Sequence, residues 1–164
     1  MIIVMLIIGL CQGMQPIVGY NFGAHHYDRV EKVFKKTVTV ATIISTCGFL
    51  LALFTPKLIV SAFTTDETLT AIATHGLRIS MLCFPIVGFQ IVTTNLFQSI
   101  GMAWKAIFLS LSRQVLFLLP MVWLLPNFLE LNGVWMSPPT ADLTAGIVSA
   151  FFLVYQWKRF QASL

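Results

Sequence analysis

The chain of 164 residues is 57% hydrophobic and only 10% charged, with a mean hydropathy of +0.86. A soluble globular domain has about 25% charged residues. The formal net charge is +4, but the basic residues lie between apolar runs and form no basic patch interleaved with aromatic residues, which argues against a nucleic-acid partner. The composition therefore excludes an ordinary soluble domain and predicts a protein that lies in the lipid bilayer.

Five apolar runs, separated by short polar or Pro/Gly-rich breaks, predict five membrane-spanning helices. A hydrocarbon core of about 30 Å needs about 20 apolar residues per helix, so this length accommodates about five spans and little else. The predicted spans cover residues 1–20, 37–54, 76–100, 106–125 and 134–157. The predicted fold class is an all-α membrane protein, a bundle of about five transmembrane helices formed by residues 1–164.

The connection between the second and third spans has its own pattern. Residues 57–74 are short, amphipathic and punctuated, which predicts an interfacial connection in which Thr65 or Asp66 caps a new helix. The third span contains Pro85 and Gly88. Because a proline removes a backbone hydrogen bond and bends a helix, we predict a kink or hinge at these two residues.

The basic residues are unevenly divided between the two sides of the predicted bundle. If the loop after the first span is cytoplasmic, only Lys57 and Arg78 lie on the opposite side. The cytoplasmic side then holds Arg29, Lys32, Lys35, Lys36, Lys105, Lys158 and Arg159. The positive-inside rule therefore predicts a multi-pass protein of the plasma (inner) membrane with a cytoplasmic carboxyl terminus. Since an odd number of spans then begins outside, we expect further helices to precede this chain.

Asp142 is the only carboxylate inside an apolar run, about seven residues into the fifth span. An ionisable group at membrane depth is by default a functional-site hypothesis, here contact with a substrate or a coupling ion. The alternative is structural, because Asp142 follows Pro138 and Pro139 and could cap the start of a helical segment.

Arg113 lies about eight residues into the fourth span, counted from Lys105. Its long side chain is expected to snorkel back to the interface rather than to contact a substrate. A pair with Asp142 is not expected, because the two residues enter the membrane from opposite faces.

Uncharged amides also occur inside the predicted spans. Each needs a partner because lipid offers none, and each either bonds a neighbouring helix or lines a polyspecific cavity together with Met and Phe side chains. These amides are Gln12, Gln15, Asn95, Gln98 and Gln114.

The sequence shows no enzyme chemistry. His25 and His26 are adjacent and point to different faces of any helix, and His75 is far away, so no metal site is predicted. Neither a nucleophile elbow nor a phosphate-binding loop is present, and no cofactor is expected.

Four ordered motifs resemble the multidrug and toxic compound extrusion (MATE) family. Residues 15–24, QPIVGYNFGA, resemble the signature at the cytoplasmic end of the eighth helix of these transporters. The later helices are matched in order and spacing by FQSIG at 97–101 with Lys105 and Ala106, by SRQ at 112–114, and by GVW at 133–135 with Pro139, Ala141 and Asp142.

The resemblance implies a partial carboxyl-terminal half of a twelve-helix carrier, helices eight to twelve. It implies a fragment or short form of an antiporter that exports amphipathic organic cations in exchange for Na⁺ or H⁺, by alternating access together with the missing amino-terminal half. Two alternatives stay open. The chain is a truncated, transport-inactive membrane module, or it belongs to a lipid-linked oligosaccharide flippase of the same superfamily, for which more buried basic residues than Arg113 are expected.

Overall fold

The structure, a computed structural model, describes residues 2–161 and contains only helices and their connections within that range. Its elements in chain order are α1 (Ile2–Gly23), α2 (Tyr27–Phe54), α3 (Pro56–Ser61), α4 (Glu67–Ser80), α5 (Phe84–Ser99), α6 (Ala103–Leu111), the π-helical segment η1 (Ser112–Leu118), α7 (Leu119–Leu124) and α8 (Pro126–Gln161). The predicted all-α class is confirmed.

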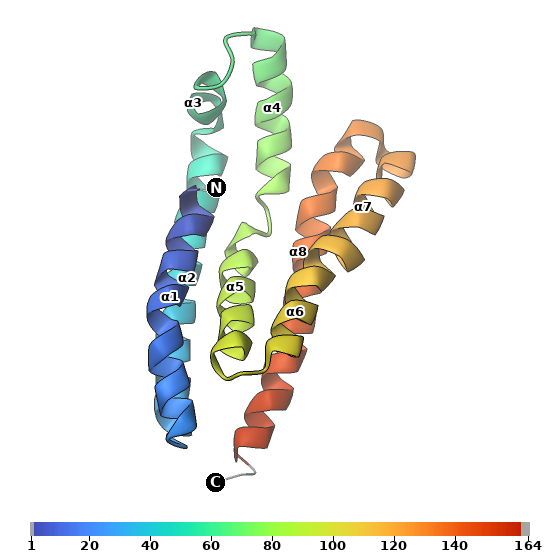
Figure 1. Ribbon diagram of the computed structural model, residues 1–164. Coiled ribbons are helices and arrows are strands. Elements are labelled where there is room, and N and C mark those ends of the chain that lie inside the picture. Colours follow the sequence, from blue (N-terminus) through green and yellow to red (C-terminus); the bar gives the residue numbers. More distant parts are fainter. Residues whose placement is uncertain (1, 162–164) are drawn as a thin grey trace.

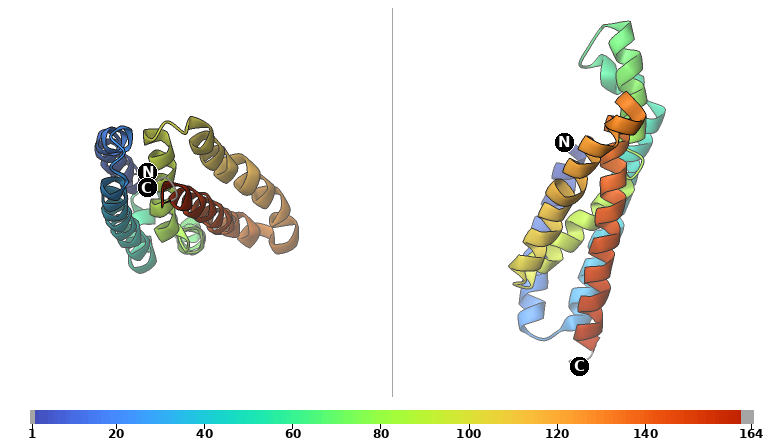
Figure 2. Two further views of the ribbon diagram at one scale, coloured as in Figure 1. Left: turned by 90° about the horizontal axis from the view of Figure 1, so that it is seen from below. Right: turned by 90° about the vertical axis from the view of Figure 1, so that its right-hand side faces the viewer.

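The helices form three neighbouring groups (Figure 1). One side is the antiparallel pair α1 and α2, the middle is α5 with α4 beyond it, and the other side is the hairpin of α6–α7 with α8. The turn between α1 and α2 lies at the same end of the bundle as the end of α8, and α3 and α4 project at the opposite end (Figures 1 and 2).

Helical periodicity explains how α1 and α2 pack. The buried apolar residues of α1 are Ile7, Cys11, Met14 and Val18, which recur every three or four residues and so form one stripe. The buried stripe of α2 is made of small residues at its far end, including Ala41, Ser45, Gly48 and Ala52. Small residues let helix backbones approach closely, as in membrane bundles.

Gly88 of α5 lies against this small-residue stripe. A Cβ atom at Gly88 would come within 2.8 Å of both the Ala41 carbonyl oxygen and Ser45 Oγ. Ser45 Oγ also donates a hydrogen bond of 3.2 Å to the Pro85 carbonyl oxygen. The glycine that the sequence marked as a hinge is therefore at a tight contact between α5 and α2.

The third predicted span is broken rather than continuous. Helices α4 and α5 meet at an angle of 52°, and the break falls at residues 81–83, just before Pro85 in the first turn of α5. Asp66 caps α4 as predicted: its Oδ1 accepts hydrogen bonds from the N–H groups of Thr68 (2.8 Å) and Leu69 (3.1 Å).

The last two predicted spans form a hairpin whose turn lies at Glu130, the residue at which the backbone of α8 departs from helical geometry with φ of 50°. Gly133 follows this turn, and its Cα packs so close to the Leu125 carbonyl group that a Cβ atom would lie 2.4 Å from it. The remainder of α8 then runs back along α6 and η1.

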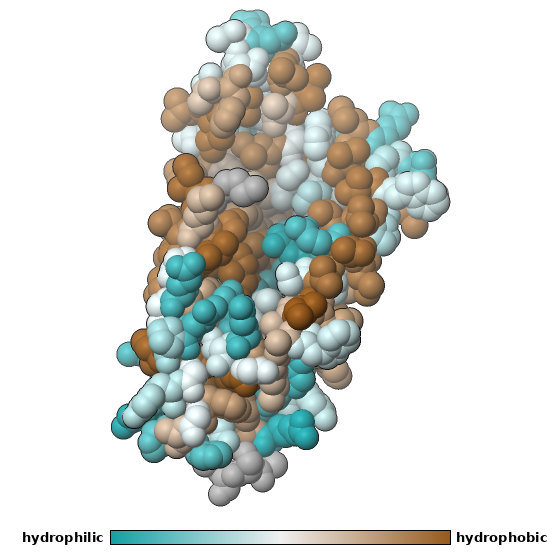
Figure 3. Space-filling model, in the orientation of Figure 1, coloured by the Kyte–Doolittle hydropathy of each residue, from teal (hydrophilic) through white to brown (hydrophobic). Residues whose placement is uncertain are grey.

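By length and composition, three helical segments of residues 2–161 are able to cross a membrane: α1, α2 and the continuous stretch Ala103–Leu124. The bent pair of α4 and α5 makes a fourth if it counts as one span. The fifth predicted span lies inside α8. Hydrophobic side chains cover much of the surface, with hydrophilic residues at both ends and in patches at mid-height (Figure 3).

Helix α8 turns its polar residues inward. Ser137, Asp142, Ser149 and Gln156 are at most 6% exposed. The outward residues include Leu143, Ile147, Phe151 and Val154, which are 47–70% exposed. This inverted distribution is typical of a helix whose outer face contacts lipid rather than water.

Candidate functional site

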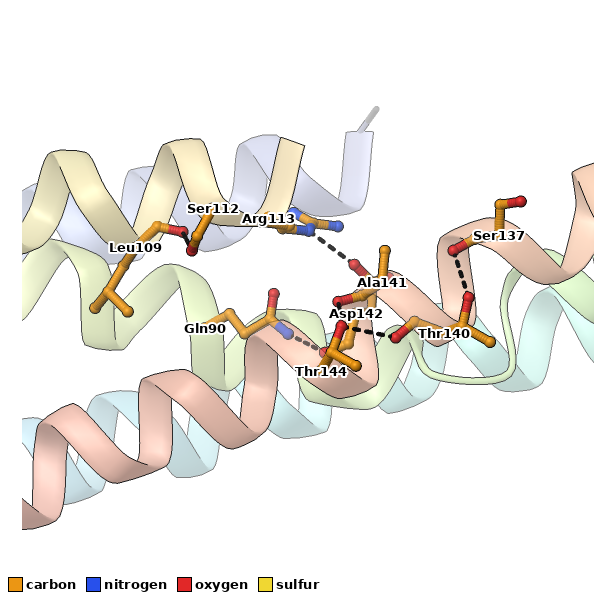
Figure 4. A network of polar contacts seen from close by, with 9 residues as sticks. All are labelled: Gln90, Leu109, Ser112, Arg113, Ser137, Thr140, Ala141, Asp142 and Thr144. Carbon is orange, nitrogen blue, oxygen red and sulfur yellow. Dashed lines mark hydrogen bonds and ion pairs between the residues drawn. The ribbon is translucent and has the colours of Figure 1, made fainter. Parts of the chain in front are cut away.

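Asp142 and Arg113 form an ion pair inside the bundle (Figure 4). Arg113 Nε donates to Asp142 Oδ1 over 2.7 Å, and Asp142 is only 6% exposed. Two expectations from the sequence are thereby wrong: Arg113 does not snorkel to the interface, and it does pair with Asp142. The buried carboxylate is neutralised by a partner from another helix, as a charge in a low-dielectric site requires.

The error came from treating the two spans as parallel rods read from opposite ends. In the structure α6 and α7 are inclined to α8 (Figures 1 and 2), so equal distances along the two chains are not equal depths. The helix also changes type at this point. Arg113 lies in the π-helical segment η1, whose end is marked by the Leu119 N–H donating to the Gln114 carbonyl oxygen. Pro120 has no N–H to continue an α-helical ladder there.

Asp142 does not cap a helix, so the structural alternative for it is also wrong. It lies well inside α8, and the helix continues through Pro138 and Pro139 before it. Hydroxyl groups stabilise this stretch locally: Thr140 and Thr144 donate to carbonyl oxygens three and four residues earlier.

Gln90 of α5 completes the cluster, and the sequence analysis missed it. Its Nε2 donates to the main-chain carbonyl oxygen of Asp142, and its side chain is almost fully buried at 4% exposure. Gly146, one turn further along α8, makes room for this approach, since a Cβ atom there would lie 2.6 Å from Ile86 and 3.3 Å from Gln90 Nε2. The available signal was a Gln two residues after Gly88 in an apolar span.

Beside the cluster lies a cavity of about 250 Å³ between α1, α5 and the α6–η1 segment. Gln90, Asn95, Arg113 and Gln114 contribute polar groups to its wall. Apolar side chains of α1, among them Val4 and Ile8, complete it. Arg113 is the only Lys, Arg, Asp or Glu among the described residues that line this cavity.

The other predicted site residues divide into two groups. Gln15 and Asn95 meet, because Gln15 Nε2 donates to Asn95 Oδ1 over 2.8 Å and so links α1 to α5. Gln12 is exposed, and Gln98 is exposed beside a separate hollow lined also by Ala103 and Ile107. The structure therefore gathers Asp142, Arg113, Gln114, Asn95 and Gln15 around one region and leaves Gln12 and Gln98 outside it.

A second polar link ties the turn after α5 to α8. Lys105 Nζ donates to Gln156 Oε1 over 2.7 Å, and it lies 5.4 Å from the centre of the Phe97 ring and 5.9 Å from that of Tyr155. A metal centre is not apparent: the described residues contain no group of three or more His, Cys, Asp or Glu side chains able to hold an ion.

These features define a class of protein: an all-helical, multi-pass membrane protein with a buried polar cluster beside an internal cavity. The sequence profile of the MatE family matches residues 1–124, most of the chain. The chain belongs to the MatE family, a family of transporters and not of enzymes.

Individual relatives agree with the family. The multidrug export protein MepA of Staphylococcus aureus (strain bovine RF122 / ET3-1) is 27% identical over 153 residues, which cover 92% of this chain and 33% of MepA. A solved structure of the MATE multidrug transporter DinF-BH, in complex with the dye rhodamine 6G, is 37% identical, with a TM-score of 0.87 over 93% of this chain and 34% of that chain.

An inward-facing MATE family transporter of the MOP superfamily shares the fold, with a TM-score of 0.89 at 19% identity over 99% of this chain and 37% of that one. The chain thus spans about one third of the length of the relatives it matches.

Proposed function

We propose that this chain forms helices eight to twelve of a multidrug efflux antiporter, which exports organic cations in exchange for Na⁺ or H⁺. The observation that carries the proposal is the buried Arg113–Asp142 pair beside a polar cavity in a chain of the MatE family. Ionisable groups at membrane depth mark substrate and ion pathways. The rhodamine complex of the DinF-BH relative supports an organic cation as the substrate.

In this proposal the chain crosses the plasma (inner) membrane five times and keeps its carboxyl terminus in the cytoplasm. The inverted polarity of α8 supports its assignment as the fifth span. The turn between α1 and α2, where four of the basic residues lie, is at the same end of the bundle as the end of α8 (Figure 1), as the positive-inside rule requires.

Alternating access needs a second half against which these helices move, and the break between α4 and α5 is a natural place to absorb part of that motion. The missing part of the relatives' length supports an amino-terminal partner.

The test is a chimaera in which this chain replaces the matched third of the DinF-BH transporter. Cells that express it should accumulate less of the rhodamine dye than cells with empty vector, and the difference should require a Na⁺ or an H⁺ gradient. Asp142→Asn should abolish the difference. Asp28→Asn, which makes the same chemical change at an exposed site in the first turn of α2, should retain it.

Unchanged rhodamine accumulation with a correctly inserted chimaera, under both ion gradients, would reject the antiporter and favour the transport-inactive module. The oligosaccharide flippase is not favoured, because the described cavity wall carries one basic residue.

A further inference from the structure

Gln90 carries a buried hydrogen-bond acceptor without a partner. Its Oε1 is one of three buried side-chain atoms of the described residues that lack one. Its orientation is fixed, because the Asp142 carbonyl oxygen only accepts hydrogen bonds and so must face the Gln90 nitrogen. The Gln90 oxygen therefore points away from α8, toward the side on which Arg113 lies (Figure 4). An unsatisfied amide in this setting is costly, which calls for a donor that reaches it in another state.

Arg113 is the donor best placed to do so. Its guanidinium has five N–H donors, and its printed contact with Asp142 engages only Nε. The side chain is 35% exposed and, like Gln90, forms part of the cavity wall. A long, partly free side chain between two acceptors is able to change partners without moving its helix.

The charges give a reason for the change. While Arg113 neutralises Asp142, the site has no net charge to attract a cation, and Arg113 repels any cation that enters the cavity. A cation that reached the Asp142 carboxylate would have to displace Arg113. Asp142 and Arg113 are the only pair of opposite charges that the structure records within the bundle, the other recorded bridge being Lys35–Glu31 at its end.

We propose that Arg113 is a tethered counter-ion, which a transported or coupling cation displaces from Asp142, and that Gln90 Oε1 receives the displaced guanidinium. This inference rests on the proposed function and deepens it. Asp142 alternates between an internal cation and an external one, so the carboxylate is never left buried without a partner, and an empty transporter presents a neutral site.

The test measures energetic coupling between Arg113 and Gln90 by a double-mutant cycle of Arg113→Met and Gln90→Met in this chain, unfolded with SDS in mixed micelles. In the unsubstituted background the two residues should show almost no coupling, because Arg113 is bound to Asp142. In the Asp142→Asn background, which imitates a neutralised carboxylate, coupling of about three- to tenfold in the unfolding equilibrium constant is expected, the range of interhelical hydrogen bonds. The control cycle pairs Arg113→Met with Gln98→Met, on the same helix but beside a separate hollow.

A second arm keeps Asp142 and adds saturating Na⁺ or the rhodamine dye, with choline as the inert salt. This arm decides the matter if Asp142→Asn fails to fold. Coupling that rises with either cation supports the exchange and identifies whether an inorganic or an organic cation drives it. Coupling that neither cation changes, or that is absent in a folded Asp142→Asn background, overturns it. The cycle involves no transport, so efflux failure in the chimaera and failure of the exchange are separate results.

Discussion

Among single residues, Gly88 makes the most demanding contact between α5 and α2. A larger side chain there has to displace the Ala41 carbonyl or Ser45, and both belong to the buried stripe of α2. Gly88→Leu should therefore destabilise the chain by about 1–3 kcal/mol, the usual effect of overpacking, as measured by SDS unfolding in mixed micelles.

Gly13→Ala provides the matched control, because nothing lies within 4 Å of a Cβ atom at Gly13. Alanine stabilises a helix interior by about 1 kcal/mol relative to glycine, so this variant should be as stable as the parent or slightly more so. Equal stability of Gly88→Leu and the parent chain would contradict the packing described for α5 and α2.

The Arg113–Asp142 pair makes a prediction of opposite sign for single and double changes. Removal of one partner from a buried pair costs about 3–5 kcal/mol, whereas replacement of both by apolar residues is often neutral or stabilising. Because Arg113 is about one third exposed, Arg113→Met should fall at or below the lower end of that range. The double variant Arg113→Met with Asp142→Leu should recover most of the lost stability in the same unfolding assay.

If the double variant is as unstable as the sum of the two single variants, the two side chains do not interact. Efflux by the chimaera should be lost in all three variants, since stability without the carboxylate does not restore a cation site.

Among the helices, the break between α4 and α5 is the feature that a sequence reading located only approximately. Pro85 and Gly88 predicted a bend in the third span, and a bend of 52° is present. The proline is in the first turn of α5 and the glycine is used for packing. Sequence predicts where a backbone hydrogen bond is missing, but the point at which the helix opens depends on what its two sides pack against.

Pro85→Ala should straighten the α4–α5 pair, because it returns a backbone donor next to the break. Spin labels at the exposed positions Thr68 and Gln98 should then lie further apart in pulsed electron resonance measurements.

Pro56→Ala, in the first turn of α3, is the control and should leave this distance unchanged. An unchanged distance in Pro85→Ala as well would show that packing rather than the proline maintains the bend.

The site was partly predictable for a related reason. Asp142 and Asn95 are conspicuous in apolar runs, and the need for a partner in lipid correctly predicted interhelical hydrogen bonds such as that from Gln15 to Asn95. The Arg113–Asp142 pair was not predictable, because it depends on the inclination of α6 and on the π-helical segment, and neither feature leaves a periodic trace in the sequence. Gln90 was missed because its partner is a main-chain carbonyl group.

For the molecule as a whole, composition and run length predicted the all-α membrane class, and the MatE resemblance is confirmed by the family match. The order of the helices along the bundle follows from the runs themselves, because consecutive spans joined by short turns must be antiparallel neighbours. What sequence patterns do not reveal is which polar face of a helix turns inward, as α8 demonstrates.

Sidedness of the helix ends tests this account most directly. In a chain whose native Cys11, Cys47 and Cys83 are replaced by alanine, single cysteines are introduced at Lys35, Lys57 and Lys158 and reacted with a membrane-impermeant maleimide. In intact cells only the cysteine at position 57 should react, and after the membrane is opened all three should react. Labelling of positions 35 and 158 from opposite sides of sealed cells would contradict the arrangement of membrane-crossing helices proposed for this chain.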